Sequence, residues 1–147
     1  MKERIVVVID VVGLRPEHLA MGDAAPNLHR LATAGRVARI KPVFPAVTLP
    51  VQASLTTGLD PQEHGVVANG FYSREDFTVG FWEQAASLVQ GERFWEKIKK
   101  RRPEFKTAVL FWQNSLYARA EVVITPRPLH TDDGMISWCY SKPVGLY

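Results

Sequence analysis

A short β-branched run near the N-terminus constrains the fold more than any other feature of the chain. Residues 4–9 are apolar at consecutive positions after Arg4, which is typical of a strand buried on both faces of a parallel sheet. Further strands are predicted at 36–41, 107–111 and 121–125, and helices are predicted at 26–34, 50–57 and 94–100. Because strands alternate with helices, the pattern predicts an α/β fold with a mainly parallel sheet flanked by helices.

Composition restricts the class of protein more weakly than the strand pattern does. The 147 residues are enough for one core, and no repeat or linker divides them, so a single domain over 1–147 is predicted. The net charge of +3 makes no case for nucleic acid or an anionic membrane as a partner. Cys139 is the lone cysteine, and no segment approaches the roughly 20 apolar residues of a membrane span. We therefore expect a soluble, cytoplasmic protein.

Two polar residues stand where an α/β sheet places its ligands. Asp10 closes the first predicted strand, and ligands of open α/β sheets collect outside the carboxyl ends of the strands. A carboxylate there can bind a metal ion, although an Asp that caps a helix or stabilises a turn explains the same position. Thr48 precedes Pro50 at the predicted start of a helix, where backbone N–H groups favour an anion. Thr48 is equally compatible with a loop or cap residue, because a neutral threonine needs a base or a metal ion to become a nucleophile.

An ordered set of motifs then indicates a family. After Asp10, the chain has Phe44-Pro45-Ala46-Val47-Thr48-Leu49-Pro50, then Thr57-Gly58-Leu59-Asp60-Pro61-Gln62-Glu63-His64-Gly65, then Asn69. This set resembles the N-terminal portion of the nucleotide pyrophosphatase/phosphodiesterase family of the alkaline phosphatase superfamily. The resemblance is strongest from Asp10 to Tyr72, and Lys106 to Trp112 is similar to a later strand of the family.

The resemblance implies a fold, a cofactor and site residues. It implies the N-terminal part of an alkaline-phosphatase-like fold, with Asp10 as a zinc ligand and Thr48 as both nucleophile and zinc ligand. Asn69 matches the residue that contacts the phosphoryl group, and His64 matches a structural histidine. The expected reaction is hydrolysis of a small-molecule phosphoester or nucleotide through a phospho-threonine. A second zinc ion belongs to the full-length family enzyme.

Other ligands of the family pattern are not found in this chain. The family's second ligand group has the form Asp-Xaa-Xaa-Xaa-His, followed by Asp-His and a final His, and no such group follows Asn69 in this chain. The acidic loop from His130 to Gly134 is assigned a structural role or substrate contacts, because Asp and Gly are typical of turns. We therefore interpret the chain as a partial catalytic domain with at most one partial zinc site and little activity by itself. An exposed sheet edge would favour self-association.

Several functions stay open at this level. The sequence does not separate a diesterase from a phosphonate hydrolase or a monoesterase, whereas Thr48-Leu49-Pro50-Val51-Gln52 lacks the arginine of the sulfatase motif. The main alternative is a non-catalytic binding or assembly module that retains the fold.

Overall fold

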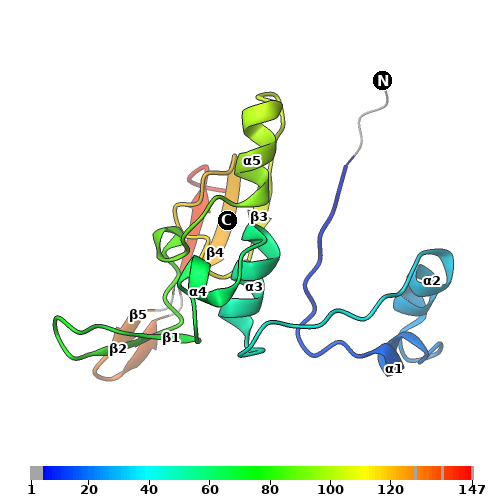
Figure 1. Cartoon of the computed structure of the whole chain (residues 1–147), viewed down its shortest axis with the longest axis horizontal. Coiled ribbons are helices and arrows are strands. Elements are labelled where there is room, and N and C mark those ends of the chain that lie inside the picture. Colours follow the sequence, from blue (N-terminus) through cyan, green and yellow to red (C-terminus); the bar gives the residue numbers. More distant parts are fainter. Residues whose placement is uncertain (1–4, 128, 137, 147) are drawn as a thin grey trace. The chain divides into compact units, whose positions relative to one another are not determined.

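The chain forms two compact units, Met1–Lys41 and Pro42–Tyr147. A computed structural model describes residues 5–127, 129–136 and 138–146 of them (Figure 1). Among these residues no helix has both the length and the apolar character needed to cross a bilayer.

The described part of the first unit is helical where it has regular structure. It contains α1 (Pro16–Leu19) and α2 (Pro26–Ala34). Pro26 occupies the first turn of α2, and the N–H of Gly35 donates to the Leu31 carbonyl at 2.9 Å to close its end. The helix predicted over 26–34 is therefore confirmed with its boundaries.

The two strands predicted in this unit are wrong. Ile5 to Ile9 belong to no strand, and each of their side chains is at least 63% exposed, while Arg4 lies outside the described residues. Residues 36–41 are also extended, exposed and outside any strand. An apolar run becomes a strand only when a neighbouring strand pairs with its N–H and C=O groups. The described residues of the first unit offer no such strand.

The second unit mixes helices and strands. Its helical elements are α3 (Thr48–Thr57), α4 (Pro61–His64), the 3₁₀ helix η1 (Ala86–Leu88) and α5 (Phe94–Arg101). Its strands are β1 (Gly70–Tyr72), β2 (Val79–Phe81), β3 (Ala108–Leu110), β4 (Val122–Pro126), β5 (Leu129–Thr131), β6 (Gly134–Ile136) and β7 (Cys139–Lys142). The helices predicted from Pro50 and from Phe94, and the strands predicted at 107–111 and 121–125, are thus present.

The sheets are mostly antiparallel, which corrects the mainly parallel sheet that the sequence predicted. Among the described strands only β3 and β4 pair in parallel, and β7 joins β4 antiparallel. The pairs β1–β2 and β5–β6 are antiparallel hairpins. Two strands joined by a short loop can pair only in the antiparallel direction. Residues 111–121 between β3 and β4 form a connection long enough for parallel pairing.

Two charged segments lie where turn and helix chemistry favours them. Asp132 and Asp133 form the exposed turn of the β5–β6 hairpin, as expected for an acidic loop ending in Gly134. The basic residues Lys99 to Arg101 occupy the last turn of α5, where the helix dipole favours cations.

Two apolar clusters hold the second unit together. One joins α5 to β3 and β4 through Trp95, Val109, Ala118, Ala120 and Val123. The other packs α3 against the segment that follows α4, through Leu49, Ala53, Val66 and Val89. The second cluster matters most for function, because it anchors the first turn of α3.

Candidate active site

Thr48 is the first residue of α3 and is half-buried. Val47 before it is extended, with φ −115° and ψ 165°, so the chain enters the helix directly at Thr48. The next two residues, Leu49 and Pro50, are fully buried in the core. The backbone that carries the Thr48 hydroxyl is therefore fixed by packing on its C-terminal side.

Asn69 lies at the same helix end. Its Oδ1 accepts the backbone N–H of Leu49 at 3.0 Å, across 20 residues of sequence. Since Oδ1 faces the helix, the Nδ2 amide group of Asn69 is turned away from Leu49 and can donate elsewhere. The structure thus brings Asn69 next to Thr48, although the two were separate motifs in the sequence.

This arrangement changes how the helix end can hold an anion. Pro50 has no N–H, Leu49 donates to Asn69, and Val51 donates to the Val47 carbonyl at 3.2 Å. Within the described residues, the Thr48 N–H and hydroxyl and the Asn69 amide remain as donors. An anion here would contact Thr48 and Asn69 rather than a row of free backbone N–H groups.

His64 has a structural environment. It is fully buried at the end of α4, and its Nδ1 accepts the N–H of Val66 at 3.1 Å. Its Nε2 therefore carries the proton and donates to Ser54 Oγ of α3 at 2.9 Å. Burial lowers the pKa of His64, so the neutral ring is the folded form. The ring ties α3 to the segment leading to Asn69, as expected for a structural histidine.

The burial of His64 predicts acid sensitivity. Unfolded His64 takes up a proton below about pH 6.5, whereas the folded ring has a lowered pKa and stays neutral further into acid. The free energy of unfolding should therefore fall as the pH drops below about 6.5, by at most ~1.4 kcal/mol per pH unit. Urea unfolding between pH 5 and 7.5 measures this slope. His64→Gln should flatten it and His29→Gln should leave it unchanged, whereas an unchanged slope in His64→Gln would contradict the assignment.

A network of two buried glutamines, Gln52 and Gln84, and the half-buried Gln113 connects α3 to the sheet. Gln52, one turn after Thr48, accepts the N–H of Gln113 on its Oε1 at 2.9 Å. Gln113 Oε1 accepts Gln84 Nε2 at 2.5 Å, and Gln84 Oε1 accepts the Thr125 hydroxyl at 3.4 Å. These residues link the start of α3 to the carboxyl ends of β3 and β4, the edge where α/β sheets bind ligands. None of these residues was predicted from the sequence, although a glutamine among apolar neighbours on α3 was a usable signal.

Arg93 braces the other end of α3. It is 5% exposed, and its guanidinium donates to the Thr56 hydroxyl and, at 3.1 Å, to the Asn114 carbonyl. Burial lowers the pKa of Arg93 to about 10, with Glu96 opposing the shift, so the side chain is still charged at neutral pH. The loop after β3 that it holds contains Phe111, Asn114 and Tyr117 at positive φ, a strained conformation for residues other than glycine.

The structure does not place Asp10 as the sequence predicted. Asp10 is exposed and follows an unpaired extended segment of the first unit rather than a buried strand, for the reason given above. Thr48 and Asn69 belong to the second unit. The structure therefore supports the pairing of Thr48 with Asn69 and does not test the pairing of Asp10 with Thr48.

A complete metal site is absent from the described residues. They contain no group of three or more His, Cys, Asp or Glu side chains that could hold an ion. The neighbour of Thr48 is a neutral amide, whereas zinc in proteins is held by at least three N, S or carboxylate ligands. Asp10 and Thr48 supply suitable oxygen donors but too few of them, so the residues present do not by themselves fit a bound zinc ion.

Comparison with known proteins identifies the family. The family model for type I phosphodiesterase / nucleotide pyrophosphatase matches residues 6–143, so the chain belongs to this family. An uncharacterized pyrophosphatase/phosphodiesterase of Schizosaccharomyces pombe is 31% identical over 115 residues. Ectonucleotide pyrophosphatase/phosphodiesterase family member 3 of Bos taurus is 27% identical over 116 residues, and family member 1 of Homo sapiens is 29% identical over 109 residues. No solved structure matches the chain significantly.

The matched relatives are much longer than this chain. The alignments cover 73%, 75% and 70% of this chain but only 23%, 13% and 12% of the three relatives. Family membership supports a phosphoester hydrolase of the α/β class, and the predicted family resemblance is confirmed. Because the alignments cover less than a quarter of each relative, family membership does not establish for this chain the activity of a whole protein of this family.

Proposed function

We propose that this chain carries the nucleophile of a metal-dependent phosphoester hydrolase of the phosphodiesterase/nucleotide pyrophosphatase type. The observation that supports the proposal is the bond from the Leu49 N–H to Asn69 Oδ1, because it holds the Asn69 side chain at the end of α3 that begins with Thr48. The substrate class is a small phosphodiester, pyrophosphate or nucleotide. Neither nucleic acid nor a membrane surface is proposed as a partner, given a net charge of only +3.

In this proposal Thr48 is the nucleophile, and Asn69 donates a hydrogen bond to the phosphoryl group. The Thr48 hydroxyl oxygen bonds to phosphorus as the bond to the leaving oxygen breaks. The hydroxyl proton passes to solvent water and the leaving oxygen takes up a proton from solvent, so that a phospho-threonine and a free alcohol or phosphate result. Water then cleaves the phospho-threonine and restores the hydroxyl. Asn69 Nδ2 donates to a non-bridging oxygen, where negative charge accumulates in the transition state.

The Thr48 hydroxyl needs activation that its own surroundings do not supply. His64 is engaged with Ser54 and Val66, and it is not available as a base at Thr48. A bound zinc ion would lower the pKa of the hydroxyl, and Asp10 with Thr48 are the ligands we propose from this chain. Because these two are too few, we propose that further ligands come from outside the described residues and that the chain alone binds zinc weakly.

Zinc dependence gives the direct test. With added zinc, we expect slow hydrolysis of a chromogenic phosphodiester, bis(4-nitrophenyl) phosphate, that a chelator abolishes. Asp10→Asn keeps the size of the side chain and removes its charge, so it should lower the zinc-dependent rate at least about tenfold. Asp23→Asn, an exposed Asp of the same unit, is the matched control and should hydrolyse at the wild-type rate.

Three outcomes would count against the proposal. Zinc-independent turnover would contradict metal dependence, and equal rates in the two variants would remove Asp10 from the site. No turnover in any protein, together with no increase in melting temperature on adding zinc, would favour the non-catalytic binding or assembly module, since a ligand stabilises only the state it binds.

A further inference from the structure

The β1–β2 hairpin begins directly after Asn69 and brings Trp82 opposite that residue (Figure 1). Gly70 pairs with Phe81, so the next pair along the ladder is Asn69 with Trp82. The Trp82 N–H donates to the Asn69 carbonyl at 3.0 Å, and residues joined in this way across antiparallel strands have Cα atoms about 5.5 Å apart. Trp82 is therefore the cross-strand neighbour of the residue proposed to contact the phosphoryl group.

The backbone of Trp82 is held in an unusual conformation. Its φ is 58°, in the left-handed region, which is strained for a large side chain and is found most often at functional sites. Asn69 accepts its N–H, and its carbonyl accepts Gln84 Nε2 at 2.8 Å. Gln84 also bonds to Gln113, which donates to Gln52 of α3. The bonds that fix Trp82 thus come from the candidate site and from the network attached to its helix.

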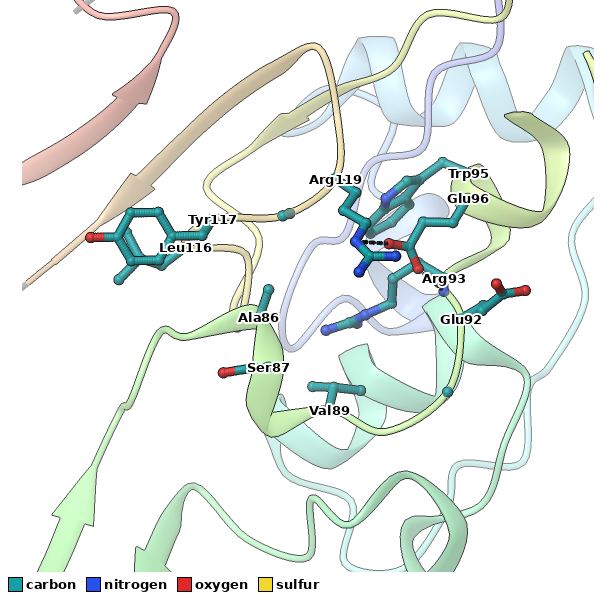
Figure 2. Close-up of a pocket in the computed structure, with 12 residues that line it drawn as sticks. Ala86, Ser87, Val89, Glu92, Arg93, Trp95, Glu96, Leu116, Tyr117 and Arg119 are labelled. Atoms are coloured by element: carbon teal, nitrogen blue, oxygen red, sulfur yellow. Dashed lines mark hydrogen bonds and ion pairs between the residues drawn. The ribbon is translucent and has the colours of Figure 1, made fainter. Parts of the chain in front are cut away.

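The indole ring of Trp82 is open to a ligand. It is 41% exposed, and no aromatic or cationic side chain among the described residues stacks on it. The other tryptophans are engaged. Trp95 lies beside charged side chains at a cavity (Figure 2), with Arg93 5.8 Å from its ring centroid. Trp138 has an arginine over its ring, and Trp112 packs against the cluster that contains Trp95.

A free indole face suits a flat aromatic group. Aromatic rings attract one another in offset-stacked or edge-to-face arrangements, beyond the apolar area that they bury. Stacking of a nucleobase on an aromatic side chain strengthens binding about fivefold to a hundredfold. An aliphatic group of the same size gains only the buried area. An indole beside a phosphate-binding amide therefore distinguishes esters by the group that the phosphate carries.

We propose that Trp82 is a specificity-determining residue, which stacks on a flat aromatic ring in the ester group of the phosphate bound at Asn69. Aryl esters and nucleotides share this chemistry. The inference rests on the proposed function, which places the phosphate at Asn69. It goes further than that function because it states which esters the site prefers, namely aromatic ones over aliphatic ones of equal size.

The side-chain amide signal of Asn69 in a ¹⁵N spectrum follows binding without turnover. This signal is identified as the one that Asn69→Asp lacks. The first pair of probes is phenyl phosphate and cyclohexyl phosphate, whose rings are of equal size but only the former is flat. The second pair is adenosine 5′-monophosphate and ribose 5-phosphate, of which only the former carries a nucleobase. Every probe has the same phosphate group, so a difference within a pair reports on the ring.

We expect at least one aromatic probe to bind about fivefold or more tightly than its partner in the pair. Trp82→Ala should remove that advantage. Trp82→Phe should keep most of it, because phenylalanine retains a flat ring. Tighter binding of phenyl phosphate than of adenosine 5′-monophosphate identifies an aryl ester as the ligand, and the reverse order identifies a nucleotide.

Phe77 provides the matched control. It is 78% exposed, has a φ of 57°, and lies in the turn between β1 and β2, at the other end of the hairpin from Asn69. Phe77→Ala should bind every probe as the wild type does. If Trp82→Ala does not fold, Trp82→Leu replaces it, because leucine keeps an apolar side chain without a flat ring.

Two results would overturn the inference. The first is that neither aromatic probe binds more tightly than its partner, which includes the case in which no probe binds. The second is an aromatic advantage of equal size in the wild type and in Trp82→Ala.

Hydrolysis of bis(4-nitrophenyl) phosphate with added zinc separates this inference from the proposed function. Zinc-dependent turnover without an aromatic preference that depends on Trp82 would reject the inference and leave the function standing. Binding that depends on Trp82, with no turnover, would reject the hydrolase function and leave the aromatic subsite standing.

Discussion

Thr48→Ala is expected to reduce zinc-dependent phosphodiester hydrolysis by on the order of 10³-fold or more, to the uncatalysed rate. The reason is that the variant removes the only atom proposed to bond to phosphorus, while leaving the helix that carries it in place. Thr48 is half-buried at the first position of α3, and the next residues, Leu49 and Pro50, anchor that turn in the core. The rate with bis(4-nitrophenyl) phosphate and added zinc measures the effect.

Thr48→Ser is the matched control for that experiment. Serine keeps the hydroxyl and loses only a methyl group, so we expect measurable zinc-dependent activity that Thr48→Ala lacks. Urea unfolding of both variants should differ from the wild type by less than about 1 kcal/mol, which separates loss of the nucleophile from loss of the fold. Equal rates in the wild type and Thr48→Ala would contradict the threonine mechanism.

Leu49→Ala is expected to have the largest effect on stability, lowering the free energy of unfolding by about 2–5 kcal/mol. Leu49 has no exposed surface and packs with Ala53, Val66 and Val89, so truncation removes buried contacts and leaves a cavity. A loss of that size is a large share of the ~5–15 kcal/mol typical of a folded domain. Urea unfolding followed by circular dichroism measures it.

Leu55 provides the comparison on the same helix. It is 50% exposed, so Leu55→Ala makes the identical chemical change at a position where little surface is buried. We expect Leu55→Ala to change the free energy of unfolding by no more than about 0.5 kcal/mol. Similar losses at both positions would show that α3 is not anchored through Leu49 and that the position of Thr48 has another cause.

Local signals account for the elements that were predicted well. Pro26 and Gly35 delimit α2, and Gly58 ends α3 in the left-handed conformation, with φ 74°. Each signal acts within a turn of the chain and needs no distant partner. The strands β3 and β4 were also predicted. That prediction is confirmed because their two apolar runs pair with each other in parallel.

Pairing partners account for the elements that were predicted wrongly. The run from Ile5 to Ile9 has strong strand propensity, but a strand is defined by a second strand that accepts its hydrogen bonds. The described residues of its own unit contain helices and no such partner. For the same reason Asp10 is exposed and does not lie at the end of a buried strand.

The sequence by itself determined the family, the helix predicted from Pro50, and the residue types of the candidate site, because motif order and helix signals are properties of the chain alone. Only the tertiary structure decided that Asn69 lies against the start of α3, that His64 is a buried structural link, and that Gln52, Gln84 and Gln113 connect α3 to the sheet. Each of these contacts joins residues far apart in the sequence. Their geometry depends on how apolar surfaces pack, and no local pattern of residues specifies that packing.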